Sequence, residues 1–252
     1  MLVAERYEKI VRLVNERGSV RVTELAALFG VTEETIRRDL AALEQAGRLK
    51  RSHGGAVSVR DVQGELPYFV REVTHAAEKE RIAREAVKRI EPCDRILLDA
   101  STSAWYMARH LPDIPLTVLT NSIKVATELA AKEKIDVIVS GGRLSPRSLS
   151  FVGPQAETSF QDYHVDKLFF SCKGVHPERG LSESNDLQAR LKRQFIGMAE
   201  RVVLLADSSK FGVQAFARIA GLERVDAVIS DDGLDGKTKE QLEERGIEVV
   251  LA

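Results

Sequence analysis

Residues 19–57, SVRVTELAALFGVTEETIRRDLAALEQAGRLKRSHGGAV, decide the fold of the first part of the chain. A helix is predicted over residues 4–17, before this stretch. Within the stretch we expect a short helix capped by Thr23, a sharp turn at Gly30, and a further helix capped by Thr32. The apolar residues of the short helix that we expect to face the core are Leu25, Leu28 and Phe29.

The second helix of the stretch is followed by a basic hairpin. Ile36, Leu40 and Leu43 recur at the spacing of one buried helix face, and Gly47 ends the helix. Residues 49–51 and 56–59 can pair as strands around two glycines that supply the positive φ of a tight turn. Two helices, a turn and a basic hairpin are the layout of a winged helix-turn-helix, which places its second helix in the DNA major groove.

If the apolar stripe of this helix is buried, Glu34 and Arg38 point the opposite way. The planar fork of Arg38 matches the two acceptors of guanine, and Glu34 and Thr35 are the next candidates for base contacts. The neighbouring basic residues are expected to bind phosphates, whereas Asp39 is expected to pair with an arginine or with the first helix. For an isolated arginine pair, solvated surface charge would be the default interpretation. The predicted DNA contacts are Thr32, Glu34, Thr35, Arg37, Arg38, Lys50, Arg51 and His53.

Composition and charge agree with a cytoplasmic, DNA-binding protein of two domains. The chain has 252 residues, 44% hydrophobic and 30% charged, and a net charge of −1. Residues 1–60 carry eleven Lys and Arg against eight Asp and Glu, so the basic excess lies in the predicted DNA-binding part. The sequence shows no signal peptide and no apolar run of membrane-spanning length. The two cysteines, Cys93 and Cys172, lack metal-type spacing and fit a reducing compartment.

We predict a winged helix-turn-helix domain over 1–57, a linker over 58–77 and an α/β domain over 78–252. Buried, Val/Ile/Leu-rich strands alternate with helices in the last part, which favours a mostly parallel sheet. Strands are expected at 95–99, 116–120, 136–140, 167–171, 201–206, 226–230 and 247–251, and helices at 75–90, 102–110, 122–132, 187–200 and 237–245.

Hydroxyls, amides and charges follow several of these strands. Residues 101–103, Ser-Thr-Ser, end a strand and begin a helix, where hydroxyls and free backbone amides form an anion site. Lys210 would add a charge for a phosphate, while Asp99 and Asp207 would accept hydroxyl hydrogens. Taken singly, such residues are more often helix caps, turns or solvated lysines. The predicted effector contacts are Asp99, Ser101, Thr102, Ser103, Thr120, Asn121, Gly141, Gly142, Lys173, Asp207 and Lys210.

The run VTEETIRRDLAALEQAGRLKRSHGGAV (31–57) resembles the signature of the DeoR family of bacterial sugar-operon regulators, above all in IRRDL and HGGA. The segments of the second domain that resemble the family's effector domain are LDASTS (98–103), LTNS (119–122), SGGRLSP (140–146), SFVGP (150–154), CKGV (172–175), GLSESN (180–185) and ADSSKFG (206–212). The resemblance implies a sheet related to ribose-5-phosphate isomerase and the coenzyme A transferases, with a phosphorylated sugar as ligand. It also implies a repressor of a sugar-catabolism operon that binds double-stranded operator DNA as a homodimer or homotetramer.

An alternative is a sugar-phosphate isomerase or coenzyme A transferase-like enzyme with a DNA-binding appendage. The related isomerases use an acidic loop, and the DeoR family commonly shows Ala-Asp-Gly at the matching strand end. This chain has Cys172-Lys173-Gly174 there, which argues against isomerase chemistry. Lys173 could favour a more acidic ligand, or could pair with Glu183 or Asp207. We find no metal-ligand spacing, nucleophile triad or dinucleotide fingerprint, so no cofactor is expected.

Overall fold

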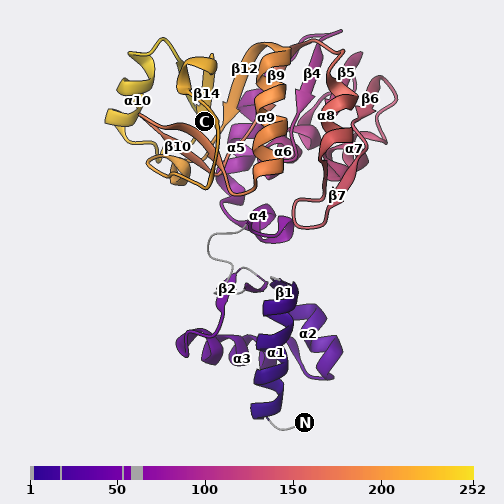
Figure 1. The fold of residues 1–252 in the computed structure, drawn as a ribbon, viewed down its shortest axis with the longest axis vertical. Coiled ribbons are helices and arrows are strands. Elements are labelled where there is room, and N and C mark those ends of the chain that lie inside the picture. Colours follow the sequence, from indigo (N-terminus) through magenta and orange to yellow (C-terminus); the bar gives the residue numbers. More distant parts are fainter. Residues whose placement is uncertain (1–2, 18, 53, 58–64) are drawn as a thin grey trace. The chain divides into compact units, whose positions relative to one another are not determined.

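The computed structural model describes residues 3–17, 19–52, 54–57 and 65–252. It divides into two compact units, Met1–Thr74 and His75–Ala252 (Figure 1). The boundary falls inside the range 58–77 that the sequence marks as a linker. That range also contains a short helix, α4 (Tyr68–Val73), which the sequence pattern did not predict. Among the described helices, none has both the length and the apolar character needed to cross a membrane.

The N-terminal unit packs helices against a small antiparallel sheet. Its described elements before α4 are α1 (Val3–Arg17), β1 (Ser19–Arg21), α2 (Val22–Phe29), α3 (Glu33–Gln45), β2 (Lys50–Ser52) and β3 (Gly55–Val57). The strands pair in the order β1-β3-β2. The core between these elements contains the predicted stripe of α3 together with side chains from α1, α2 and the turn before β2: Ile10, Val14, Leu25, Ile36, Leu40, Leu43 and Leu49. The predicted winged helix-turn-helix layout is therefore present.

Two details of α2 differ from the sequence expectation. Thr23 lies inside the helix, which begins at Val22 after an extended Arg21 that makes no side-chain capping bond. Leu28 is 57% exposed. At about 100° per residue, Leu28 lies about 120° around the helix from the buried Val22, too far to share its buried face. A helix of two turns is too short for its apolar stripe to be read from spacing alone.

The tip of the wing uses its two glycines for different reasons. Gly54 has φ +79°, the left-handed conformation expected of a hairpin glycine. Gly55 does not need a positive φ; instead, a Cβ on Gly55 would lie 2.2 Å from the carbonyl oxygen of Val20. The close approach of β3 to β1 therefore requires this glycine.

A seven-stranded sheet organises residues 75–252, and all its described pairs are parallel. In pairing order the strands are β15 (Glu248–Leu251), β14 (Ala227–Ser230), β12 (Ala199–Leu205), β9 (Val165–Phe170), β4 (Arg95–Leu98), β5 (Leu116–Thr120) and β6 (Ile135–Val139). The chain runs from β4 outward to β6, and then returns to β9 on the other side of β4 and continues outward to β15. The pair β4–β9 is thus the switch point, where open parallel sheets bind ligands beyond the strand ends.

Helices cover both faces of this sheet (Figure 1). They are α5 (Ala76–Val87), α6 (Thr102–His110), α7 (Ile123–Leu129), α8 (Pro154–Phe160), α9 (Asp186–Met198) and α10 (Gly236–Glu243). Alternate strand residues enter two separate cores. Leu97 packs in one core with Phe160 of α8 and Phe195 of α9. Ile96 packs in the other core with Ile82 of α5 and Met107 of α6. The predicted α/β fold class is confirmed.

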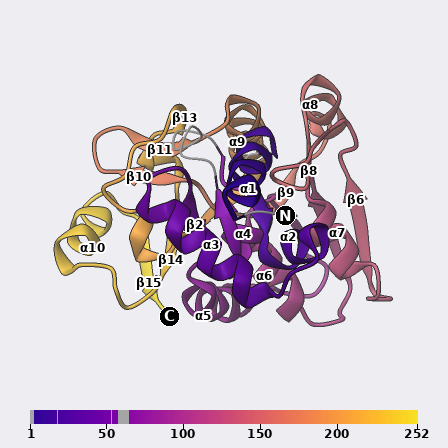
Figure 2. The same cartoon turned by 90° about the horizontal axis from the view of Figure 1, so that it is seen from below.

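Smaller strands that the sequence pattern did not predict complete the unit. They are β7 (Arg143–Ser145) and β8 (Ser150–Val152), which form a hairpin, and β10 (Gly174–His176), β11 (Gly180–Glu183) and β13 (Ala217–Ala220), which form an antiparallel sheet. Two 3-10 turns, η2 (Ser208–Lys210) and η3 (Leu222–Arg224), lie in loops. In Figure 2 the small sheet lies toward α10, whereas α8 lies toward β6.

Candidate functional site

Helix α3 begins with the predicted cap. Thr32 Oγ1 accepts a hydrogen bond from the backbone N–H of Thr35 at 3.2 Å. This cap fixes the first turn of the helix, the part of a recognition helix that meets DNA bases. Glu34, Arg37 and Arg38 are all exposed on this helix. Glu34 and Arg38 lie opposite its buried stripe, and Arg37 lies on the flank.

The two arginines of α3 are held differently. Arg37 donates to Glu33 Oε2 at 2.6 Å, one turn earlier on the helix. The Arg38 guanidinium lies 3.5 Å from Glu34 and its side chain is 81% exposed. An exposed pair at this distance contributes little free energy, so the fork of Arg38 is available to an incoming partner.

Asp39 faces the protein interior. Arg6 of α1 donates to it twice, through Nε to Oδ2 at 2.5 Å and through NH2 to Oδ1 at 3.0 Å. Both side chains are buried. This bidentate ion pair fastens α3 to α1. The expectation that Asp39 pairs with the first helix is confirmed.

The wing presents two of its predicted residues to solvent. Lys50 and Arg51 are exposed on β2, and the backbone N–H of Arg51 donates to Glu44 Oε1 at 2.7 Å. This bond ties β2 to the end of α3. Arg37 and Arg51 line a common groove between α3 and the wing. His53, the remaining predicted contact, lies outside the described residues.

The predicted effector residues of the second unit all lie at the carboxyl edge of the large sheet. They follow or end strands that are adjacent in it: Asp99, Ser101, Thr102 and Ser103 after β4, Thr120 and Asn121 at the end of β5, Gly141 and Gly142 after β6, Lys173 after β9, and Asp207 and Lys210 after β12. Segments that are far apart in sequence are therefore brought to one edge, which spans the switch point between β4 and β9.

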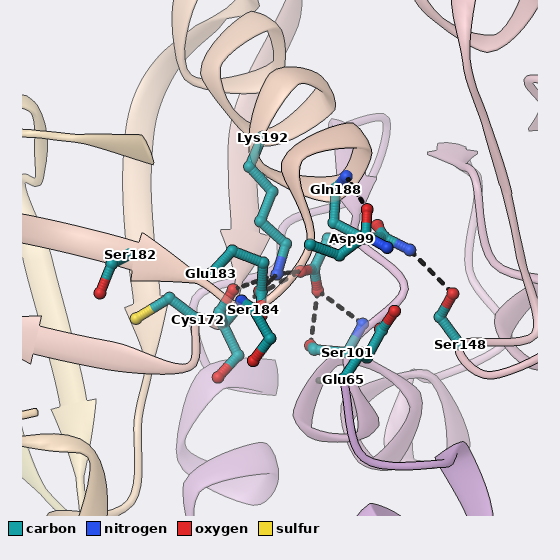
Figure 3. Close-up of polar contacts among 12 residues, drawn as sticks. Glu65, Asp99, Ser101, Ser148, Cys172, Ser182, Glu183, Ser184, Gln188 and Lys192 are labelled. Atoms are coloured by element: carbon teal, nitrogen blue, oxygen red, sulfur yellow. Dashed lines mark hydrogen bonds and ion pairs between the residues drawn. The ribbon is translucent and has the colours of Figure 1, made fainter. Parts of the chain in front are cut away.

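Asp99 organises the centre of this edge (Figure 3). Its Oδ1 accepts from the backbone N–H and the hydroxyl of Ser101, at 3.1 and 2.5 Å. Its Oδ2 accepts from the backbone N–H of Ser171 at 3.4 Å. Ser101 in turn caps α6, because its Oγ accepts from the N–H of Ala104 at 3.1 Å. Asp99 is fully buried. Its hydrogen bonds to Ser101 and Ser171 hold together the loops after β4 and β9.

Lys192 of α9 is a central residue that the sequence analysis missed. Its ammonium lies 3.2 Å from Asp99 Oδ2 and donates to Glu183 Oε2 at 2.5 Å and to the Ser171 carbonyl at 2.7 Å. Burial alone would lower the pKa of Lys192, but the Glu183 and Asp99 carboxylates outweigh burial and raise it, so the side chain stays cationic. Figure 3 shows Lys192 reaching from α9 to both acids.

The sequence did carry a signal for Lys192. It lies four residues after Gln188 and three before Phe195, both buried on α9. It therefore occupies the stripe that faces the core, although Arg190 and Arg193 beside it are exposed.

Lys210 and Asp207 lie next to this cluster. Lys210 Nζ donates to the carbonyl of Cys172 at 2.9 Å and is 4.0 Å from Asp207 Oδ2. Burial raises the pKa of Asp207, but Lys210, the Ser209 hydroxyl and nearby cations outweigh burial, and the net shift is downward. Burial raises the pKa of the Cys172 thiol to about 12, so it stays protonated. The side chain of Lys173 is exposed.

Buried polar atoms at this edge lack hydrogen-bond partners in the described part of the chain. They include Asn121 Oδ1 and Ser171 Oγ, after β5 and β9 on either side of the Asp99 loop. Unsatisfied buried polar groups are costly and rare, which makes them candidates for ligand contacts.

Gly142, also at this edge, has φ +106°, and a Cβ there would lie 3.0 Å from the Ala156 backbone nitrogen, so this position requires glycine.

No cluster of three or more metal-binding side chains occurs among the described residues. The site contains hydroxyls, amides, lysines and paired carboxylates. Such a set can bind an anion and hydrogen-bond neutral hydroxyl groups.

Comparisons with known proteins cover nearly the whole chain. Residues 6–62 match the family described as the DeoR-like helix-turn-helix domain, and residues 74–232 match the DeoR C terminal sensor domain. An uncharacterized HTH-type transcriptional regulator, YulB of Bacillus subtilis, is 53% identical over 99% of this chain and 96% of that protein. A putative aga operon transcriptional repressor of Escherichia coli O157:H7 is 37% identical over 98% of this chain and 93% of that protein.

Among solved structures, ribose 5-phosphate isomerase A of Methanocaldococcus jannaschii is similar over 54% of this chain and 55% of that chain. The TM-score is 0.41 and the sequence identity is 18%.

Proposed function

Because this chain belongs to the DeoR family of transcriptional regulators, we propose that it represses a sugar-catabolism operon and that a phosphorylated sugar relieves the repression. The N-terminal unit binds operator DNA, and the C-terminal unit binds the effector. A DNA-binding regulator acts where the DNA is, in the cytoplasm. Two winged helices are needed to read two operator half-sites, so the active form is a homodimer or homotetramer.

In the DNA-binding unit, Arg38 reads a base, and Thr32, Glu34 and Thr35 line the same end of α3. Arg37 and Arg51 bind phosphates from the two sides of the groove between α3 and the wing, and Lys50, exposed on the wing, binds a further phosphate. The observation that supports this division is the 81% exposure of the Arg38 side chain on the outer face of a capped helix.

Arg38→Ala is expected to weaken operator binding by about 1–3 kcal/mol and to relax the preference at one base position. Lys50→Ala, the matched control in the wing, should weaken operator and random DNA alike and flatten the salt dependence, because it removes a phosphate contact. The measurement is fluorescence anisotropy with operator, single-base operator variants and random duplex at two or more salt concentrations. Equal loss on operator and random DNA for Arg38→Ala would remove it from base recognition.

One observation supports the effector site: the predicted anion-binding and hydroxyl-binding residues follow neighbouring strands along one edge of the sheet, on both sides of the switch point between β4 and β9. The phosphate binds at the first turn of α6, near the backbone amides of Thr102 and Ser103, since the Ser101 amide already donates to Asp99, and Lys210 adds a positive charge. The sugar extends toward Asn121, whose Oδ1 is a buried acceptor without a donor among the described residues.

The pairing of Asp99 and Glu183 with Lys192 favours ligand binding over catalysis at this site. A general base needs a lone pair directed at the substrate. Asp99 accepts hydrogen bonds on both oxygens, and Glu183 accepts from Lys192 and from the backbone N–H of Ser184. We therefore propose a regulator without isomerase activity. A turnover assay with pentose and hexose phosphates tests this, and steady product formation would contradict it.

Lys210→Ala is expected to leave operator binding intact and to abolish release by the effector. The substitution removes the charge that would attract the phosphate. Its present partners are the Cys172 carbonyl and, at 4.0 Å, the Asp207 carboxylate, so some stability is lost but the fold is expected to remain. Coupling between sites is typically about 1–3 kcal/mol, so one lost phosphate contact can remove the visible response.

The measurement for Lys210→Ala is operator affinity with and without each of a panel of sugar phosphates, first selected by thermal shift on the wild-type chain. Lys239→Ala, a substitution on the partly exposed α10, is the control and should respond as wild type. Normal release of Lys210→Ala at the wild-type effector concentration would exclude Lys210 from the site.

A further inference from the structure

A cluster of neutral side chains lies beside the charged part of the effector site. Gln188 of α9 donates through Nε2 to the hydroxyls of Ser148 and Ser150, at 2.9 and 2.7 Å. Ser150 also donates to Ser148, which donates to Ser145, at 2.9 and 2.7 Å. Gln188, Ser148 and Ser150 are buried, and Figure 3 shows the Gln188 amide directed at Ser148.

Asn121 joins this cluster to the carboxyl edge of the sheet. Its backbone carbonyl accepts from Phe151, the residue after Ser150, at 2.8 Å, and its side-chain nitrogen donates to the Phe151 carbonyl at 3.0 Å. Because the side-chain nitrogen is held by Phe151, the side-chain oxygen Oδ1 is the atom left for another partner. Oδ1 is buried without a donor among the described residues, and Asn121 is only 1% exposed. The cluster therefore presents an acceptor that a ligand hydroxyl can satisfy.

Helix α9 contributes one residue to a charged part of the site and one residue to a neutral part. Gln188 and Lys192 are four residues apart and lie on the same face of the helix. Lys192 holds Asp99 and Glu183, the charged side of the site. Gln188 holds Ser148 and Ser150 of the β7–β8 hairpin, where the groups are neutral and hydrogen-bonded to one another. Neutral groups that both donate and accept match the hydroxyls of a sugar, whereas the phosphate belongs with the lysine and the α6 amides.

We propose that Asn121, Ser148, Ser150 and Gln188 form the subsite that reads the sugar hydroxyls and so decides which sugar phosphate the protein accepts. This inference rests on the proposed function, because it concerns the same ligand. A site built to hydrogen-bond a hydroxyl strongly rejects an analogue that lacks it or points it elsewhere, since buried partners are then left unpaired. Gln188 acts as a positioning residue, because it orients the serine hydroxyls.

The test measures binding of the full chain, by calorimetry, to probes that share the phosphate and differ in one hydroxyl. The probes are glucose 6-phosphate and its epimers galactose 6-phosphate and mannose 6-phosphate, each of which differs from it at one carbon. Ribose 5-phosphate serves as a shorter sugar phosphate, and inorganic phosphate is the phosphate-only probe. The wild-type chain should prefer one sugar over its epimers by at least about tenfold. Gln188→Met should reduce this preference to within about threefold and leave the affinity for inorganic phosphate unchanged.

Gln194→Met is the matched control, since Gln194 lies on the same helix and donates to the Glu157 carbonyl at 2.7 Å, away from the serines. It should keep the wild-type preference. Ser148→Ala removes one hydroxyl with little change in volume and should also narrow the preference, so the test stands if Gln188→Met folds poorly. Equal weakening of every probe, phosphate included, or an unchanged preference in both variants would overturn the subsite. If the wild-type chain binds none of the sugars, the proposed function fails for these ligands, and the subsite fails with it.

Discussion

Lys192→Met is expected to lower the free energy of unfolding of the C-terminal unit by about 3–5 kcal/mol and to abolish the effector response. Lys192 is the buried counter-ion of two carboxylates, Asp99 and Glu183, and methionine would leave both charges unpaired in the interior. The loop that begins α6 would also lose its anchor, because Asp99 holds the Ser101 cap. Thermal and urea unfolding of the full chain, followed by two or more probes, measures the loss.

Arg193→Met is the control for this prediction, since Arg193 is the next residue on α9 and pairs at 3.6 Å with Asp186 on the exposed face. It should unfold like the wild type. A variant that combines Lys192→Met with Asp99→Asn and Glu183→Gln removes all three charges and should regain most of the lost stability. Its effector response should remain lost, because the neutral loop no longer holds the α6 amides as firmly. Wild-type stability of Lys192→Met alone would show that the three charges are not coupled.

The pH dependence of this cluster follows from the same contacts. The pKa of Lys192 is raised in the folded protein, so its pairing stabilises the fold throughout the range below the unfolded lysine pKa. That contribution disappears only as the pH rises through the folded pKa, in strongly alkaline solution. Titration of Lys192 therefore plays no part in sensing near neutral pH.

Much of the α/β unit could be predicted because parallel strands in a covered sheet are apolar on both faces. The strand Leu116–Thr120 and the helix Thr102–His110 were predicted with their observed bounds. The short strands around the site could not be predicted. β7 and β8 have three residues each. Ser148 of the turn between them and Ser150 of β8 accept hydrogen bonds from Gln188, which lies about forty positions away in sequence. Only the tertiary pairing gives these segments their structure.

The candidate site likewise contains residues that could be predicted from the sequence and residues that could not. Residues that follow predicted strands, such as Ser101 and Asn121, could be placed at one edge from the strand pattern alone. Lys192 and Gln188 come from a helix, where a polar residue is usually solvated, and their roles depend on partners from other segments. Asp99 was expected to contact a ligand, and the structure adds that its oxygens already hold two loops in place. Whether it also touches the ligand stays a prediction.

In the N-terminal unit, Arg6→Met is expected to lower stability by about 3 kcal/mol and, with it, to remove operator binding. Asp39 would be left as an unpaired carboxylate in the interface between α1 and α3. We take the lower end of the range for a broken buried pair, because the two side chains keep 10% and 6% exposure. A unit of this size buries little surface and has a small margin of stability, so the loss is a large share of the total.

A double variant, Arg6→Met with Asp39→Leu, distinguishes loss of the ion pair from loss of packing. Replacing both charges with apolar side chains of similar size is often neutral, so this variant should fold and bind operator again. Arg48→Ala, which breaks the exposed pair between Arg48 and Glu8, should change stability little. The measurements are unfolding followed at the N-terminal unit and operator affinity at one fixed salt concentration. Folding without recovered DNA binding in the double variant would mean that the charges of Arg6 and Asp39 serve DNA recognition directly. That result would contradict a purely structural role for Asp39, in which it fastens α3 to α1 so that Arg38 can face the bases.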